Sequence, residues 1–121
     1  MATLKLETHE DQRAYRPGDR IEGVAGWDLD QPPRSAEVRL FWHTSGKGDT
    51  DVAIAAVHRF ESPSAVDAQI FGMDAPAGPY SFSGRLVSLQ WTLELVLEPG
   101  GHARRLDLTI GPAGAEVRME R

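Results

Sequence analysis

The stretch APAGPYSFSGRLVSLQWTLELVLEP, residues 75–99, decides the fold class of this chain. It begins with Pro76, Gly78 and Pro79, which restrict or break the backbone, and it continues into a run with a period of two. One face of the run is mostly polar, and the other is apolar: Val87, Leu89, Trp91, Leu93, Leu95 and Leu97. Because successive side chains of a strand point to opposite faces, the run predicts a long strand with one side on a core and the other mostly in water.

The same alternation recurs in shorter segments along the rest of the chain. It predicts further strands at residues 3–8, 21–29, 37–44, 51–61, 66–70 and 106–110, separated by turns rich in Gly, Pro and Asp. The capped i, i+3, i+4 pattern of an amphipathic helix is not found. We therefore expect an all-β protein of seven or eight strands in a two-sheet antiparallel sandwich of immunoglobulin-like dimensions. A closed barrel is the minor alternative.

Several local signals predict details of this sandwich. Pro17 and Gly18 have the pattern of a type II turn, and Gly23 and Gly26 within one strand suggest a bulge or the close approach of a neighbouring chain. Residues 45–50, SGKGDT, predict a hairpin turn. On the strand after this turn, one face is expected to consist of Val52, Ile54, Ala56, His58 and Phe60.

Length and composition limit the possible functions. The chain has 121 residues, which suits one domain at residues 1–112 with a short tail or edge strand at 113–121. It contains no cysteine and no apolar run of the roughly 20 residues that span a bilayer, so we expect a cytoplasmic protein with no transmembrane segment. The net charge of -5 is spread along the chain without a basic cluster, which makes nucleic acid an unfavourable partner.

Two stretches together resemble the arrestin-like family. Residues 15–23, YRPGDRIEG, followed by residues 38–40, VRL, are similar to the aromatic, Pro-Gly-acidic turn and the glycine-containing strand at the start of that domain. Residues 79–84, PYSFSG, and residues 87–93, VSLQWTL, are similar to its Pro-x-Ser-Phe-x-Gly corner and the following Ile-x-Tyr/Trp-x-Leu strand. The order and the separation agree, so the resemblance covers most of the chain.

The resemblance implies a non-catalytic protein-binding or scaffolding module. Arrestin-like proteins usually carry two such sandwiches and act as adaptors for receptors, cargo or protein tails, and bacterial members resemble sporulation-control proteins. This chain holds one sandwich, which matches the first of the two, so any function that uses a cleft between two domains is in doubt. No residue here matches the family's phosphate-sensing polar core.

The candidate chemical groups each favour a structural explanation. The four histidines, His9, His43, His58 and His102, lack the spacing of a metal site, and His58 is expected to be a hydrogen-bonded core residue. The glycines and lysine of residues 45–50 lack the upstream glycine and the following helix of a phosphate-binding loop. Glu94 and Glu98 suggest a solvated strand face. We therefore expect no cofactor, no metal and no catalytic set.

Aromatic residues provide the remaining candidates for binding. Trp27, Trp42 and Trp91 share faces with aliphatic residues, which indicates core positions. Phe41 lies on the opposite face of its strand with charged neighbours, so an exposed Phe41 beside Arg39 and His43 could contact a partner.

Three hypotheses follow from the sequence. The first is a module that binds a protein partner, or a copy of itself, through an exposed edge strand. The alternative is a carbohydrate- or small-ligand-binding sandwich, which requires an exposed tryptophan. An enzyme would require His43, His58 and Asp51 to converge within hydrogen-bonding distance.

Overall fold

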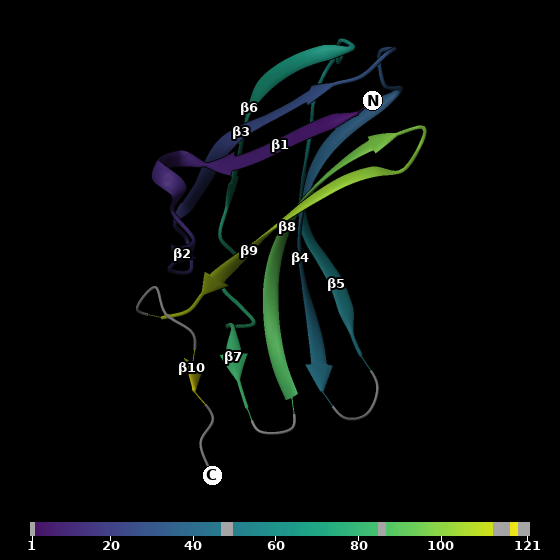
Figure 1. The fold of residues 1–121 in the computed structure, drawn as a ribbon. Helices are drawn as coiled ribbons and strands as arrows, with labels where there is room; N and C mark the ends of the chain where they lie inside the picture. The colour runs from purple at the N-terminus through teal and green to yellow at the C-terminus, as the bar shows by residue number, and fades with distance from the viewer. Residues whose placement is uncertain (1, 47–49, 85–86, 113–116, 119–121) are drawn as a thin grey trace.

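The computed structural model describes residues 2–46, 50–84, 87–112 and 117–118 (Figure 1). Apart from the 3-10 turn η1 (His9–Asp11), the regular elements in these ranges are strands: β1 (Thr3–Thr8), β2 (Ala14–Tyr15), β3 (Arg20–Asp28), β4 (Ser35–Gly46), β5 (Val52–Arg59), β6 (Val66–Asp74), β7 (Phe82–Ser83), β8 (Val87–Glu98), β9 (His102–Ile110) and β10 (Val117–Arg118). The seven strands longer than two residues match the expected segments. The strands β2 and β7, of two residues each, are additional to the prediction, and β10, also of two residues, lies in the predicted tail or edge strand at residues 113–121.

The strands form two sheets, as the sequence predicts. The smaller sheet has the order β1-β3-β6, and the larger one has β4 and β8 at its centre, with β5 on one side and β7 and β9 on the other. All the long ladders are antiparallel, and parallel pairing occurs in the two-residue contacts of β2 with β9 and of β10 with β7. Part of the predicted tail thus forms a short strand, β10. The expected all-β antiparallel sandwich is confirmed.

The inward faces of both sheets supply one core. On β8 the predicted apolar face is buried from Leu89 to Leu97, and Trp91, Leu93 and Leu95 have no exposed surface. The smaller sheet contributes buried residues of β1, β3 and β6: Leu6, Ile21, Ala25, Trp27, Phe71 and Met73. Burial of these side chains, at about 25 cal/mol per Å² of apolar surface, is the main term that holds the two sheets together.

Two predictions about glycine are confirmed. Gly18 has a φ of 87°, and the N–H of Asp19 donates to the carbonyl of Arg16 at 3.0 Å, as a type II turn requires. Gly23 lies on the inward face of β3, where an added Cβ would collide with the main-chain oxygen of Glu7 and lie 2.8 Å from the ring of Phe71. Gly23 therefore permits the close packing of three strands.

The predicted inward face of β5 is wrong for Val52 and Ile54. Leu40 pairs with Ala56 and Phe41 pairs with Ile54, so Ala55 is an extra residue that forms a β-bulge. Beyond the bulge Ala56 and the following His58 keep the inward orientation, but Val52 and Ile54 turn to the outer face. The bulge reverses the alternation, which a strict period of two cannot anticipate.

Candidate functional site

The three predicted contact residues lie side by side on the outer face of the larger sheet, but Phe41 is not exposed. Only 6% of Phe41 is accessible, because the guanidinium of Arg105 on β9 lies 5.4 Å from the centre of its ring. Arg39 and His43 are partly buried on either side. The prediction that Phe41 is exposed is therefore wrong, while the role of Arg39, Phe41 and His43 as a partner contact stays a prediction.

A layer of arginine and carboxylate side chains covers this outer face. Glu37 accepts from Arg39 at 2.6 Å and from Arg59 at 3.2 Å, and Glu94 accepts from Arg105 at 2.8 Å. The side chains of Glu37 and Glu94 are each only 14% exposed. The expectation of a solvated Glu94 is thus wrong, since long arginine side chains from neighbouring strands lie across the sheet and exclude water.

Exposed aliphatic residues lie next to this layer, on the edge strand β5. Val52, Ile54 and Val57 are 65%, 57% and 41% exposed. The strand pairing places each of them beside one of the predicted contact residues: Val52 beside His43, Ile54 beside Phe41 and Val57 beside Arg39. We call these three residues the β5 strip. The β5 strip thus lies on the same face of the sheet as the predicted contact residues, on the neighbouring strand.

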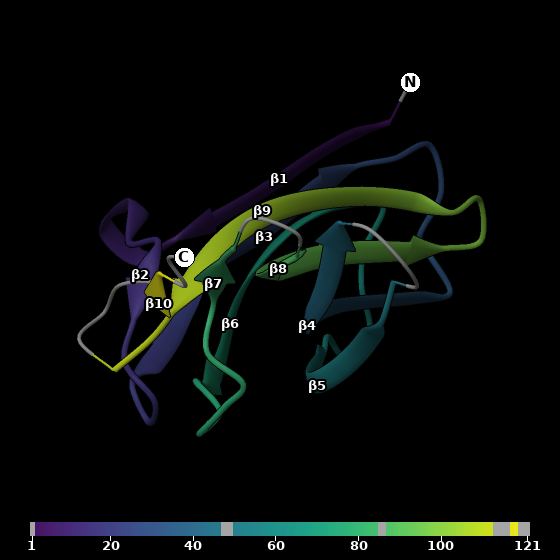
Figure 2. The ribbon, with the colours of Figure 1, turned by 90° about the horizontal axis from the view of Figure 1, so that it is seen from below.

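The free side of β5 makes this strip accessible to another strand. In the views of Figures 1 and 2, β5 lies at the rim of the molecule, and among the strands that the structure describes it pairs only with β4. Near its far end the ring of His58 contacts β6, with Nδ1 3.3 Å from the carbonyl oxygen and 3.4 Å from the nitrogen of Gly72. The predicted hydrogen-bonded position of His58 is confirmed, and it joins the two sheets at the end of β5. The contact does not involve Val52 and Ile54 at the beginning of the strand.

The proposed catalytic set does not assemble. His43 lies opposite Val52 at one end of β5 on the outer face, whereas His58 lies opposite Val38 at the other end and faces inward. Asp51 lies in the hairpin, where its N–H donates to Thr44 Oγ1 at 2.9 Å; residues 47–49 of this predicted turn lie outside the described residues. Among the described residues, no group of three or more His, Asp or Glu side chains could hold a metal ion.

The tryptophans are mainly structural. Trp27 and Trp91 are buried, and their Nε1–H groups donate to the carbonyls of Ser64 and Pro79, each at 2.8 Å. Trp42 is partly buried and packs against the edge of the core. Since a sugar-binding platform needs an open ring face, Trp27 and Trp91 give the carbohydrate hypothesis no support.

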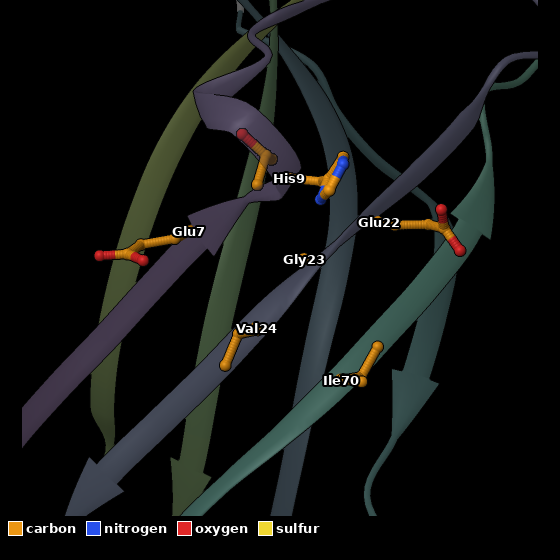
Figure 3. A pocket seen from close by; sticks show the side chains of 7 residues that line it. Glu7, His9, Glu22, Gly23, Val24 and Ile70 are labelled. Atoms are coloured by element: carbon orange, nitrogen blue, oxygen red, sulfur yellow. The ribbon is translucent and has the colours of Figure 1, made fainter.

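A second apolar surface lies on the outer face of the smaller sheet. Val24 on β3 and Ile70 on β6 are paired neighbours, 40% and 75% exposed, and Glu7 on β1 lies on the other side of Val24. Together with Glu22 and His9 they line a shallow depression of about 260 Å³ (Figure 3). We call this surface the Val24 depression.

Comparison with known proteins supports the architecture. No protein-family model matches the chain, and no curated protein matches it. Among solved structures, the sporulation control protein Spo0M of Bacillus subtilis is similar, with a TM-score of 0.63 and 18% sequence identity over 90% of this chain. The chain has an arrestin-like fold. It spans about half the length of Spo0M, since the match covers 49% of that protein.

The similarity to Spo0M establishes the fold, and no residue role is transferred at this level of identity. It confirms the resemblance inferred from residues 15–23 and 79–93. Among the described residues, none forms a helix long and apolar enough to cross a membrane. The fold by itself does not account for the exposed aliphatic side chains of the β5 strip and the Val24 depression.

Proposed function

We propose that this protein is a non-catalytic protein-binding module that captures an extended segment of a partner protein at the free edge of β5. The observation that carries the proposal is the β5 strip on an edge strand whose first six residues are uncharged. Residues 52–57, VAIAAV, contain no Lys, Pro or acidic residue. Natural sheets usually protect their edges with such residues, so an edge segment that lacks them and exposes aliphatic side chains favours the addition of a short strand.

The size of the strip favours a short segment of another protein over a stable dimer of this chain. Each partner of a stable dimer buries about 800 Å². The three partly exposed aliphatic side chains of the β5 strip provide far less. The bulge at Ala55 also twists the strand, which disfavours long pairing between two straight edges. A short added strand needs only a few main-chain hydrogen bonds and pockets for alternate side chains.

The surroundings of the strip fit an adaptor rather than an enzyme. The carboxylates on the neighbouring face are occupied by arginine, and the tested histidines and Asp51 do not converge. The absence of cysteine from the sequence and its net charge of -5 support the further proposals that the protein is cytoplasmic and that nucleic acid is not its partner.

A pair of matched variants tests the proposal. Val52 and Val66 are both valines, each is the first residue of an edge strand, and each is 65% exposed. Immobilised wild-type protein should retain a specific partner from lysate of its native source, Val52→Lys should lose that partner, and Val66→Lys should retain it. Because a lysine on an edge strand opposes pairing, the loss should exceed tenfold.

A second measurement distinguishes strand addition from other contacts. On addition of the retained partner, the backbone amides of β5 should exchange with solvent more slowly, while those of β6 should be unchanged. The proposal is wrong if no protein is retained, if both lysine variants lose the partner equally, or if β5 exchange does not change. Light scattering should give a mass near the 13.3 kDa of one chain, and a stable dimer that Val52→Lys dissociates would identify a second copy as the occupant instead.

A further inference from the structure

The Val24 depression has features of a second docking surface, on the opposite sheet from the β5 strip. Three neighbouring strands contribute to it, and Figure 3 shows Glu7, Glu22 and His9 around Gly23 with Val24 and Ile70 further along the strands. Its volume of about 260 Å³ lies below the roughly 300–1,000 Å³ of typical small-molecule sites. The size therefore favours side chains of a protein partner over a free small ligand.

The negative charge of the surrounding face favours a positively charged partner. The outward positions of β1, β3 and β6 carry four carboxylates, Glu7, Glu22, Asp28 and Asp74, against two basic residues, Lys5 and Arg20. This face therefore has an excess of two negative charges. Glu7 and Glu22 line the depression beside Val24 and Ile70, whereas Asp74 is paired with Arg20 and Asp28 lies at the far end of β3. A segment that combines aliphatic side chains with lysine or arginine would match both properties.

The ion pairs that Glu7 and Glu22 make at the depression are long and exposed, in contrast to those on the larger sheet. Lys5 Nζ is 3.9 Å from Glu7 Oε1, and Arg20 Nε is 4.0 Å from Glu22 Oε2. The side chains of Glu7 and Glu22 are 63% and 58% exposed. Exposed pairs of this kind contribute little energy, so a partner's cation can replace Lys5 beside Glu7, or Arg20 beside Glu22, without a large cost. Arg20 would keep its shorter contact with Asp74, at 3.2 Å.

We propose that the Val24 depression binds an extended segment of a partner protein in which lysine or arginine alternates with aliphatic residues. The aliphatic side chains pack on Val24 and Ile70, and the cations lie beside Glu7 and Glu22. Ala68, at the next outward position of β6, is exposed and has a short side chain, which lets a peptide backbone approach the sheet there. This surface is independent of the β5 strip, so the two proposals can fail separately.

The test uses two synthetic peptides and an NMR titration of the full chain. The probe is Ac-Leu-Lys-Leu-Lys-Leu-NH2, and the control peptide carries Glu in place of both Lys. The lysine peptide should cause saturable amide shifts at Glu7, Glu22, Val24 and Ile70, and these should weaken at high salt. The glutamate peptide should cause none, because like charges repel it from this face.

Variants determine whether the depression itself is responsible. Glu22→Gln or Glu7→Gln should each lower the affinity for the lysine peptide about two- to fivefold, as expected for one exposed ion pair. Ile70→Ser should lower it about five- to tenfold through lost apolar contact. Val66→Ser on the same strand should leave it unchanged.

The inference is overturned by no saturable shifts at millimolar peptide, by equal shifts with the glutamate peptide, or by an equal loss of affinity in Val66→Ser. Shifts confined to β5 would also reject the Val24 depression as the site, but they would support the proposed function of β5. The Val24 depression would likewise be rejected, and the function of β5 supported, if Val52→Lys abolished retention of a partner while the lysine peptide caused no shifts.

Discussion

Replacement of Trp91 by alanine should remove the largest single contribution to the core. Trp91 has no exposed surface, lies opposite Trp42 on β4 and Leu108 on β9, and donates from Nε1 to the carbonyl of Pro79 at 2.8 Å. A buried aromatic side chain covers about 150–250 Å², which at about 25 cal/mol per Å² corresponds to about 4–6 kcal/mol. Alanine retains a small part of this, so we expect Trp91→Ala to cost about 3–5 kcal/mol.

The expected loss is measurable without complete unfolding. A chain of this size has a free energy of unfolding of about 6–18 kcal/mol, so most of that range leaves the variant folded. With a urea m-value of about 2 kcal/mol per M, the unfolding midpoint followed by circular dichroism should fall by about 2 M. Trp91→Phe should cost less, about 1–2 kcal/mol, since the ring volume is largely kept and the hydrogen bond to Pro79 is lost.

Trp42→Ala is the matched control, because the two tryptophans are cross-strand neighbours that differ in burial. Trp42 is partly exposed at the edge of the core, where the ends of β4 and β5 extend beyond the smaller sheet (Figure 1). Trp42→Ala should lower the free energy of unfolding by about 1–2 kcal/mol. A loss below about 1 kcal/mol for Trp91→Ala, or equal losses for both variants, would show that Trp91 does not anchor the core.

Two further predictions concern local features, each with a control variant. Gly23→Ala should lower stability by about 3 kcal/mol or more, because its Cβ would meet the Glu7 main-chain oxygen. The control Gly26→Ala should cost under about 1 kcal/mol, since its Cβ would lie 3.4 Å from the nearest atom, a main-chain oxygen. Equal melting temperatures of the two variants would contradict this. Burial raises the pKa of Tyr15 above its usual value of 10.0, so the unfolded chain releases this proton first and stability should fall as the pH rises above about 10. Melting temperatures measured across this range should fall less in Tyr15→Phe, and Tyr80→Phe should behave as wild type.

The fold was predictable because its signals are local. The alternation of residues 87–97 and the Pro17–Gly18 turn depend on backbone geometry within a few residues, and the structure confirms both. The close approach at Gly23 was also indicated, although the sequence did not show that Glu7 and Phe71 are the neighbours. The arrestin-like resemblance of residues 15–23 and 79–93 rests on turn and core residues, so it predicts architecture better than a binding site.

The candidate surfaces were less predictable because they depend on contacts between strands. An uncharged run at residues 52–57 was visible in the sequence and is the signal that could have identified the β5 strip. The bulge at Ala55, which turns Val52 and Ile54 outward, has no such signal, since it results from pairing with β4. The Val24 depression joins residues of three strands and cannot be inferred from one segment.

The sequence by itself determined which segments are strands, where the chain turns and which face of β8 is buried, since these follow from side-chain alternation and from the restrictions of proline and glycine. Only the tertiary structure decided the exposure of Phe41 and the accessibility of β5. Phe41 is covered by Arg105, which is distant in sequence and reaches it from β9. The environment of an outer face is set by side chains from neighbouring strands, and the order and register of those strands are properties of the folded sheets.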